Sequence, residues 1–541
     1  MRKFGLALAL LCGLAGRAQA APVSTAEGPV AGKAKDGVTR FLGIPYAKPP
    51  VGPLRWMPPQ PAQKWTAVRD ATKFGPTCAQ VTTLGPFAGP PNSNEDCLYL
   101  NVFTADTKAK LPVLVWLHGG GYFDGASNDY DPAKLVTRGH LVVVTINYRL
   151  NLFGFMAHPA LDAEGHAGGN YGIMDMQAAL RWVQKNIAAF GGDPGNVTVG
   201  GQSAGAGAST ALVLSPGSKG LIHHAIFQSG GYTPFVPESI AEEKAKKFAT
   251  AAGCISKDQK GGDVAKCLRA LPAAKIEALA GTASETSPLI TNPMVDGTVI
   301  PRQEIELIQS GRFNRVPIMM GTTHDEANFN IGILQYFRKD RAPLTEADYR
   351  AYIQKTYGGN AGPGGSPPAY PKGTVDAILA RYPAAKLSAQ LAWDGAHSDM
   401  LACRGQYTAG ALTPHAPVYM YLFDDRSAQT YFPKMPGYQP LAYHTADIAY
   451  VFTGYHGGPQ GLHFTLTPAQ SQLSDHMVDA WANFARTGNP NGQGNAPWPR
   501  WQKGADTPAY LLQNEGWKIQ TNAQFAAAHN CSFWNTLLRY R

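Results

Sequence analysis

A run of β-branched residues leads directly into a Gly-x-Ser-x-Gly pentapeptide near the middle of the chain. The run covers Asn196 to Gly200, and the pentapeptide covers Gly201 to Gly205 with Ser203 at its centre. This pattern predicts a sharp strand-to-helix turn, which lifts the serine oxygen clear of the backbone so that a histidine can take its proton. Glycines suit the turn because a Cβ there would collide with the neighbouring strand and helix. Since the pentapeptide also occurs by chance, its context decides whether Ser203 is a nucleophile.

Strand-like and helix-like segments alternate through the first half of the chain. Leu111 to Leu117 and Leu141 to Ile146 are continuous apolar runs, which are typical of strands buried on both faces. Met174 to Ala188 carries apolar residues at helical spacing, and another apolar run follows at Val316 to Met320. Strands separated by helices predict an α/β fold with a large, mostly parallel central sheet flanked by helices. The ligand site of such a fold lies at the carboxyl ends of the strands.

The first twenty residues have the features of a secretory signal peptide. Arg2 and Lys3 precede an apolar stretch from Phe4 to Leu14, and Ala18-Gln19-Ala20 provides a small-x-small cleavage site. The apolar stretch is too short to span a bilayer, and no later stretch has the length and freedom from charge of a membrane helix. We therefore expect an exported protein, periplasmic or extracellular, without a stable membrane anchor.

We expect residues 21–541 to form a single catalytic domain with large insertions. The chain has 541 residues, of which 44% are hydrophobic, and this is enough for one large core. Neither an internal repeat nor an independent second domain is visible in the sequence. The longest stretch rich in glycine and proline covers 357–373. We interpret it as a flexible surface insertion, with a lid as the alternative.

The charge of the chain is only mildly basic. The formal net charge is +9, and it falls to +6 when Arg2, Lys3 and Arg17 leave with the signal peptide. The remaining cations are scattered and form no basic stripe with interleaved aromatic residues, so we expect no nucleic acid partner. A weak preference for anionic substrates stays open.

Six cysteines remain once the signal peptide is removed, and an even number in an exported chain predicts disulfides. They are Cys78, Cys97, Cys254, Cys267, Cys403 and Cys531. None shows the Cys-x-x-Cys spacing of a zinc or redox site, so we expect no metal there. Several pairings are possible, and pairing between chain neighbours gives two short loops and one long closure. On the chain-entropy model, the long closure contributes the most stability.

A second glycine-rich motif follows the apolar run that ends at Leu117. Its sequence is His118-Gly119-Gly120-Gly121, and unshielded backbone N–H groups in such a loop can bind an oxyanion. Together with the residue after the nucleophile, the candidate donors are Gly120, Gly121 and Ala204. A flexible turn is the alternative reading of three glycines in a row. The Ser203 motif favours the oxyanion site.

A serine nucleophile also needs a base and an acid, which follow it in the order acid and then histidine in hydrolases built on such a sheet. The run at Val316 to Met320 is followed by a loop with two carboxylates, Asp325 and Glu326. His444 lies shortly before the apolar Tyr450-Val451-Phe452, but composition alone leaves any of 14 histidines possible. His118 and His324 fall in the predicted site region, yet both precede the acid.

At this point the chain resembles a type-B carboxylesterase, from the cholinesterase-related branch of the α/β-hydrolases. The matching segments are Phe41–Ala47 with Pro49–Gly52, Glu95–Val102, Asn147–Arg149, Ala188–Pro194, Gly201–Gly205, and Trp481–Phe484 with Thr487–Gly488. The resemblance implies an α/β-hydrolase fold with insertions around an active-site gorge. It also implies that Glu326 is the acid, that His444 is the base and that Ser229 supports the acid. Pairing of the cysteines between chain neighbours is implied as well, and no metal or cofactor is.

The implied activity is hydrolysis of small-molecule carboxylic esters through an acyl-enzyme on Ser203. A narrower esterase for aromatic, carbamate or anionic polycarboxylate esters is one alternative, and a catalytically inert cholinesterase-like binding module is another. The chain departs from many relatives by having Gln202 where they have glutamate, which removes a negative charge beside Ser203. It also has no tryptophan between Cys78 and Cys97. Cholinesterases hold a quaternary ammonium with such a tryptophan, so we do not expect choline ester specificity.

Overall fold

The structure is a computed structural model, and it describes most of the chain after residue 20. The described residues are 21–81, 84–85, 89–231, 234–255, 261–280, 292–359, 370–454, 463–492, 495–504, 506–514 and 518–538. The predicted signal peptide at 1–20 lies outside them, as does the central part, 360–369, of the predicted insertion at 357–373. None of the described helices is long and apolar enough to cross a membrane.

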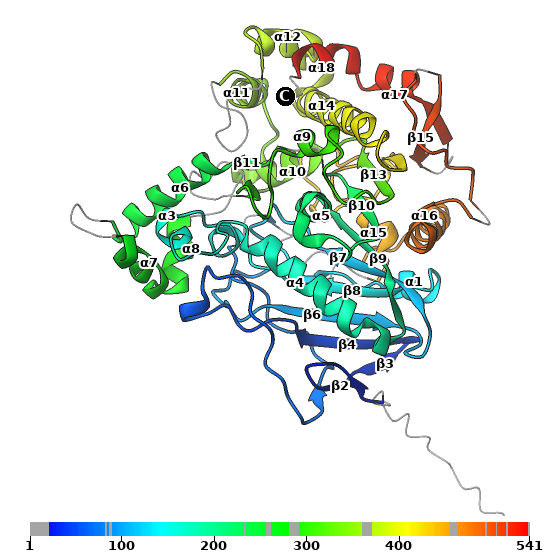
Figure 1. Cartoon of the computed structure of the whole chain (residues 1–541). Helices are drawn as coiled ribbons and strands as arrows, with labels where there is room; N and C mark the ends of the chain where they lie inside the picture. Colours follow the sequence, from blue (N-terminus) through cyan, green and yellow to red (C-terminus); the bar gives the residue numbers. More distant parts are fainter. Residues whose placement is uncertain are drawn as a thin grey trace, which may run out of the picture.

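A large mixed sheet runs through the molecule (Figure 1). In the described residues it has eleven strands in the order β16-β15-β14-β13-β10-β9-β7-β8-β6-β4-β3. Their bounds are β3 (Lys33–Lys35), β4 (Val38–Pro45), β6 (Tyr99–Thr104), β7 (Leu111–Leu117), β8 (Val142–Ile146), β9 (Gly192–Gln202), β10 (His224–Gln228), β13 (Ile318–Thr323), β14 (Val418–Phe423), β15 (Pro508–Gln513) and β16 (Lys518–Thr521). Neighbouring strands from β8 through β15 are parallel, and the pairings at both ends of the sheet are antiparallel.

Helices cover both faces of this sheet. Their bounds are α1 (Ala133–Thr137), α2 (Asn151–Gly154), α3 (Pro159–Asp162), α4 (Tyr171–Asn186), α5 (Ala204–Leu214), α6 (Glu238–Ala251), α7 (Gly261–Ala270), α8 (Ala273–Ala280), α9 (Glu304–Gln309), α10 (Asn328–Tyr336), α11 (Glu346–Tyr357), α12 (Thr374–Arg381), α13 (Ala384–Leu387), α14 (Ala389–Leu412), α15 (Ile448–Val451), α16 (Pro468–Thr487), α17 (Asn522–Ala528) and α18 (Cys531–Leu537). Short strands outside the large sheet are β1 (Val23–Ser24), β2 (Pro29–Ala31), β5 (Arg69–Asp70), β11 (Val236–Pro237) and β12 (Met294–Val295). Figure 1 shows α4 and α5 in front of the central strands, and α14 and α18 together near one end of the sheet.

The apolar core has two parts, one on each face of the sheet. In β7, Val113 and Val115 belong to the part that includes α4, whereas Leu114 and Trp116 belong to the part that includes α16. Side chains alternate between faces along a strand, so a strand buried on both faces must be apolar throughout. This explains why the central strands appear in the sequence as continuous apolar runs. It confirms the predicted α/β fold.

The predicted elements agree with the structure apart from their ends. The run from Leu111 forms β7 with the expected bounds, and the predicted helix at Met174 to Ala188 lies mainly in α4. The run at Val316 to Met320 forms β13, but the strand begins only at Ile318. Pro317 lacks an N–H group and cannot donate to the ladder, which explains the later start.

Three disulfides link the described cysteines, namely Cys78–Cys97, Cys254–Cys267 and Cys403–Cys531. These are the pairs of chain neighbours. The third joins α14 to α18, although its cysteines are 128 residues apart in sequence.

The strand register brings four loops to one edge of the sheet. Leu117 at the end of β7 pairs with Gly201, and Gln202 at the end of β9 pairs with Gln228 of β10. Gln228 in turn pairs with Gly321 of β13. Because these strands are parallel, their following loops lie side by side at the carboxyl edge. Those loops carry the candidate residues.

Candidate active site

Ser203 lies at a strained turn between β9 and α5. Its backbone has φ 59° and ψ −125°, a conformation that costs a residue with a Cβ on the order of 1–3 kcal/mol. Hydrogen bonds hold the turn: the Ser203 N–H donates to Gln228 O at 2.8 Å, and Ser203 O accepts from Ala206 N at 2.9 Å. The Ser203 side chain is only half-buried. The predicted elbow is therefore present, with its serine accessible at the sheet edge.

Packing at the turn explains both glycines of the pentapeptide. A Cβ on Gly201 would lie 2.5 Å from the carbonyl carbon of Gly205, and a Cβ on Gly205 would collide with the carbonyl oxygen of Leu117. Backbone cannot move away as a flexible side chain can, so only glycine fits at these positions. The same contacts place the end of β7 directly against the start of α5.

The loop after β7 turns its backbone toward this elbow. Gly120 and Gly121 have φ values of 106° and 60°, and the carbonyl of Gly120 accepts the N–H groups of Phe123 and Asp124 at 3.0 and 2.9 Å. A Cβ on Gly119 would lie 2.9 Å from the carbonyl oxygen of Gln202, so the loop and the elbow are in close contact. Among the described residues, no acceptor receives the N–H of Gly120, Gly121 or Ala204. These donors can bind a ligand oxygen.

His118 belongs to the same loop but is not a suitable base. Its ring is buried and stacks on Tyr148 with 4.3 Å between ring centroids, while its Nδ1 donates to Gly119 O at 2.8 Å. Burial lowers the pKa of His118 to about 4. The Tyr148 hydroxyl donates to the His118 carbonyl at 2.7 Å, which fixes the base of the loop. His118 is therefore a packing residue that shapes the glycine loop.

Glu326 follows β13 and pairs with His444. The carboxylate is buried and contacts Nδ1 of His444, and it also accepts the Thr322 hydroxyl and the Thr323 N–H, the latter at 2.8 Å. Burial by itself would raise the pKa of Glu326. The charge of His444 and the hydrogen bonds from His444 and Thr322 outweigh burial and hold the pKa below its ordinary value. The carboxylate is thus ionised and can orient the imidazole.

Ser229 lies behind the acid, at the end of β10. Its backbone has φ 53°, and its N–H donates to Gly321 O at 2.8 Å. The Ser229 hydroxyl is buried and helps to lower the pKa of Glu326. Among the described residues, none forms a hydrogen bond with this hydroxyl. The structure places Ser229 beside Glu326.

Asp325, the neighbour of the acid, secures the segment that leads to His444. Its N–H donates to Ala442 O at 3.0 Å, and its carboxylate accepts Ala442 N at 3.1 Å. Arg426 binds the same carboxylate through two nitrogens, at 3.0 and 2.9 Å. The two carboxylates of the Asp-Glu pair therefore have different partners: Glu326 contacts the imidazole, and Asp325 holds the backbone just before it.

Gln202 connects the nucleophile turn to the histidine. Its side-chain Nε2 donates to the backbone carbonyl of His444 at 2.6 Å, and its side chain is buried. The sequence singled out Gln202 only for its lack of charge. The hydrogen bond to a residue 242 positions away had no signal in the sequence.

A buried acid that follows His444 also belongs to this region. Asp447 Oδ2 accepts Gln228 Nε2 at 2.9 Å and the Tyr421 hydroxyl at 3.2 Å, and Gln228 Oε1 accepts Trp481 Nε1 at 2.8 Å. Burial raises the Asp447 pKa to about 7, against the hydrogen bond from Gln228. These partners of Asp447 have no signal in the sequence.

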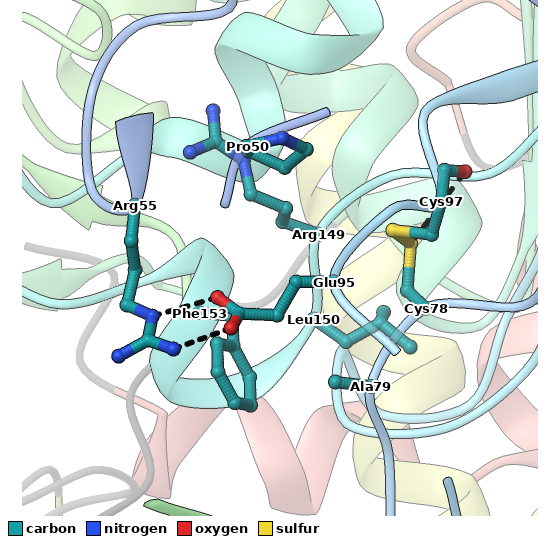
Figure 2. A pocket seen from close by; sticks show the side chains of 9 residues that line it. All are labelled: Pro50, Arg55, Cys78, Ala79, Glu95, Cys97, Arg149, Leu150 and Phe153. Atoms are coloured by element: carbon teal, nitrogen blue, oxygen red, sulfur yellow. Dashed lines mark hydrogen bonds and ion pairs between the residues drawn. A yellow bond between two sulfur atoms is a disulfide. The ribbon is translucent and has the colours of Figure 1, made fainter. Parts of the chain in front are cut away.

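The described residues contain no group of three or more His, Cys, Asp and Glu side chains that could hold a metal ion. A small hollow beside the first disulfide is lined by residues that include Arg55, Glu95 and Phe153, and by none of the candidate catalytic or oxyanion residues (Figure 2). Arg55 Nε donates to Glu95 at 2.7 Å, and its Nη1 donates to the carbonyl of Leu271 at 2.6 Å. This guanidinium is satisfied by the protein itself, so the hollow is a feature of packing.

A mostly parallel sheet with a strained serine after β9, an acid after β13 and a histidine after β14 defines the α/β-hydrolase fold. The model of the Carboxylesterase family matches residues 19–534, and the chain therefore belongs to the carboxylesterase family. It is a carboxylic ester hydrolase, as the resemblance in its sequence implied.

Similar proteins agree with this assignment over nearly their whole length. The chain is 35% identical to the para-nitrobenzyl esterase of Bacillus subtilis, over 89% of this chain and 92% of the relative. It is 35% identical to a medium-chain fatty acyl-CoA hydrolase precursor of Anas platyrhynchos, over 86% of this chain and 83% of the relative. A solved structure of a PNB esterase superimposes with a TM-score of 0.74 at 31% identity, covering 94% of this chain and 99% of the other.

Proposed function

We propose that Ser203, His444 and Glu326 are the nucleophile, base and acid of a two-step ester hydrolysis. The observation that carries the assignment is the buried pairing of the Glu326 carboxylate with His444 Nδ1 at the sheet edge where Ser203 is held at φ 59°. A carboxylate on one ring nitrogen fixes the tautomer of the imidazole, so that the other nitrogen can accept a proton. The low pKa of Glu326 keeps that carboxylate charged.

The reaction begins when His444 takes the hydroxyl proton of Ser203 and the serine oxygen attacks the ester carbonyl. The tetrahedral oxyanion accepts hydrogen bonds from the free N–H groups of Gly120, Gly121 and Ala204. His444 then gives its proton to the leaving alcohol, which leaves an acyl group on Ser203. Water, deprotonated by His444, attacks this acyl group; the bond to the Ser203 oxygen breaks, the acid is released, and His444 returns its proton to Ser203. Glu326 stabilises the imidazolium in both halves.

The substrate class is a small-molecule carboxylic ester. The relatives include a para-nitrobenzyl esterase and, at 35% identity, an acylcarnitine hydrolase of Mus musculus. Gln202 adds no charge beside Ser203, so an anionic acyl group meets no repulsion from this position. This favours anionic esters, within the second candidate of a narrower esterase for aromatic, carbamate or anionic polycarboxylate esters. Nucleic acid is not a partner in this proposal.

We also propose that the chain acts outside the cytoplasm, in the periplasm or the medium, as a single catalytic domain of residues 21–541. Three disulfides support an oxidising compartment. The basic and then apolar sequence of residues 1–20 supports export.

An inert binding module is the proposal's rival from another class. Such modules lack a member of the triad, whereas this chain has all three side chains, and its acid and base are paired. Inertness of the purified protein toward every ester tested would favour the rival.

The test is turnover of p-nitrophenyl acetate and butyrate by the purified protein. Ser203→Ala should lose all but background hydrolysis, because no other group supplies the acyl-enzyme. Ser310→Ala, which changes an exposed serine at the end of α9, is the matched control and should keep full turnover. Wild-type turnover that survives Ser203→Ala would show that another residue is the nucleophile.

A further inference from the structure

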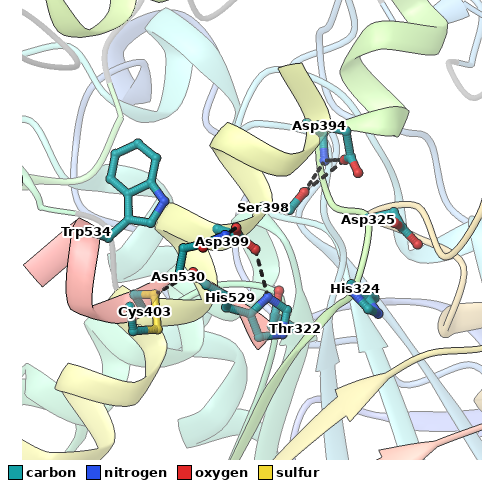
Figure 3. A network of polar contacts seen from close by, with 12 residues as sticks. Thr322, His324, Asp325, Asp394, Ser398, Asp399, Cys403, His529, Asn530 and Trp534 are labelled. Atoms are coloured by element: carbon teal, nitrogen blue, oxygen red, sulfur yellow. Dashed lines mark hydrogen bonds and ion pairs between the residues drawn. A yellow bond between two sulfur atoms is a disulfide. The ribbon is translucent and has the colours of Figure 1, made fainter. Parts of the chain in front are cut away.

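Two side chains from α14 hold the peptide that directly follows Glu326 (Figure 3). The Ala327 N–H donates to Asp394 Oδ1 at 3.1 Å and to Ser398 Oγ at 3.2 Å. The Ser398 hydroxyl in turn donates to the same Asp394 oxygen, at 2.9 Å. Asp394 and Ser398 are one helical turn apart, so they present both acceptors on one face of α14. The acid loop is thereby fixed to a long helix on its far side.

The residues of this contact are almost fully buried. Ala327 and Ser398 are each 2% exposed and Asp394 is 4% exposed, so water does not replace a lost hydrogen bond. Asp394 also has a single backbone donor as its partner from the acid loop, whereas Asp325 of that loop is bound by Arg426. The loop is thus held at two neighbouring residues, Asp325 by Arg426 and Ala327 by Asp394.

The surroundings of Asp394 raise the pKa of its carboxyl group. Burial, and then the charge of Asp325, raise the pKa of Asp394 well above its ordinary value, against the hydrogen bond from Ser398. Asp399, further along α14, acts in the same direction, and the phenol of Tyr438 also lies within electrostatic range. Burial and the charge of Asp325 therefore favour the neutral form of Asp394. In its neutral form Asp394 accepts from Ala327 without placing a second charge beside the ionised acid loop.

We propose that Asp394 is a positioning residue for the reaction: with Ser398 it fixes the Ala327 peptide so that the Glu326 carboxylate meets the imidazole of His444. The inference rests on the proposed function, since it assigns a role in placing the proposed acid. Glu326 lies between two anchored points: Thr323 before it pairs with Phe423 of β14, and Ala327 after it is bound by α14. Loss of one anchor lets the carboxylate shift, and a displacement of about 1 Å near a reacting group costs on the order of 100-fold in rate.

The same helix offers a matched control. Asp399 is also buried, at 8% exposure, but it accepts from His529 Nδ1 at 3.0 Å, from Tyr382 at 2.7 Å and from Asn530 at 2.8 Å. Figure 3 shows two of these partners, His529 and Asn530, on the side of the Cys403 disulfide, away from Asp325. Substitution of Asp399 therefore removes hydrogen bonds between α14 and the segment before α18, while the Ala327 N–H keeps its acceptors Asp394 and Ser398.

The experiment compares Asp394→Ala, Asp394→Asn and Asp399→Ala with the wild type, using kcat, KM, the pH profile of kcat/KM and the melting temperature. Asp394→Ala should lower kcat by about 10-fold to 100-fold, with KM within about twofold. In Asp394→Ala the acidic limb of the kcat/KM pH profile should move to lower pH, because a displaced Glu326 carboxylate stabilises the imidazolium less. Asp394→Asn keeps an acceptor oxygen for the Ala327 N–H and should restore kcat to within about threefold of wild type. Asp399→Ala should lower the melting temperature and leave the acidic limb in place.

A wild-type acidic limb and kcat in Asp394→Ala would overturn the proposal, and so would an equal shift of the limb in Asp399→Ala. If Asp394→Ala does not fold, Ser398→Ala decides: a smaller shift of the limb in the same direction supports the proposal, and an unchanged limb overturns it. If the wild-type protein hydrolyses esters through Ser203 and these variants behave as wild type, only the positioning role is refuted. If the wild-type protein does not hydrolyse esters through Ser203, the proposed function is refuted instead.

Discussion

The side-chain amide of Gln202 donates a 2.6 Å hydrogen bond to the backbone carbonyl of His444. This bond joins the nucleophile turn to the segment that carries the base, through an uncharged side chain directly before Ser203. A glutamate at this position would present a second acceptor to the carbonyl and add a negative charge to the site. Gln202 therefore has a structural role and an electrostatic role, which two substitutions can separate.

Gln202→Glu should lower kcat/KM for esters with an anionic acyl group about tenfold more than for neutral esters of the same size, because the new charge repels them. Gln202→Met removes the hydrogen bond without adding charge, so it should affect both ester classes alike. The measurement is kcat/KM for a charged and an uncharged ester with each variant. Equal ratios in the two variants would refute a role of Gln202 in charge preference.

Glu326→Gln should reduce kcat by about 10³-fold to 10⁴-fold with little effect on folding. A neutral amide keeps the size of the carboxylate but no longer stabilises the imidazolium or fixes its tautomer. Glu306→Gln, at an exposed position of α9, is the control and should match the wild type. Steady-state kinetics and far-ultraviolet circular dichroism of both variants check this expectation. Near-normal kcat in folded Glu326→Gln would exclude Glu326 as the acid.

Asp447 should make the protein less stable as the pH rises from about 4 to about 7. Burial raises its folded-state pKa to about 7, so the folded protein binds this proton more tightly than the unfolded chain does. By linkage, the free energy of unfolding then falls with pH in this window, by at most about 1.4 kcal/mol per pH unit. Asp447→Asn removes the titration and should flatten the slope.

Urea unfolding at several pH values measures this slope. Asp36→Asn, which changes an exposed carboxylate, is the control and should leave the slope unchanged. Burial also raises the pKa of Asp124 to about 7, so part of the slope should remain in Asp447→Asn. The same slope in Asp447→Asn and wild type would contradict the assignment of this proton to Asp447.

The disulfide between Cys403 and Cys531 should contribute more stability than the one between Cys254 and Cys267. The first closes a separation of 128 residues and the second one of 13. Chain entropy gives about 5 kcal/mol for the long loop and about 3 kcal/mol for the short one. Paired alanine variants of each disulfide, compared by urea unfolding, test the order. A larger loss for the short loop would show that native packing, and not chain entropy, dominates.

The sequence predicted the elements of the fold well, because its central strands are buried on both faces. Leu111 to Leu117 had to be apolar at every position and was therefore visible as a strand without other information. The ends of the strands are harder to predict from the sequence. At Pro317 the missing N–H shortened a predicted strand, although the apolar pattern continued through it.

For the candidate site, the sequence yielded the residues in local motifs and missed those that act across the fold. Ser203 and the glycine loop carry their signal in adjacent residues, and the pairing of Glu326 with His444 agrees with the family resemblance. The contact of Asp394 with Ala327 depends on where a distant helix packs. No local pattern distinguishes such an aspartate from one on a solvated helix face.

The most direct measurement is mass spectrometry of the purified protein after reaction with a fluorophosphonate ester. We predict one covalent adduct per chain, located by peptide mapping on Ser203, and loss of that adduct in Ser203→Ala and after heat denaturation. An adduct on another residue, or an unmodified Ser203 in protein that still hydrolyses esters, would contradict the assignment of Ser203 as the nucleophile.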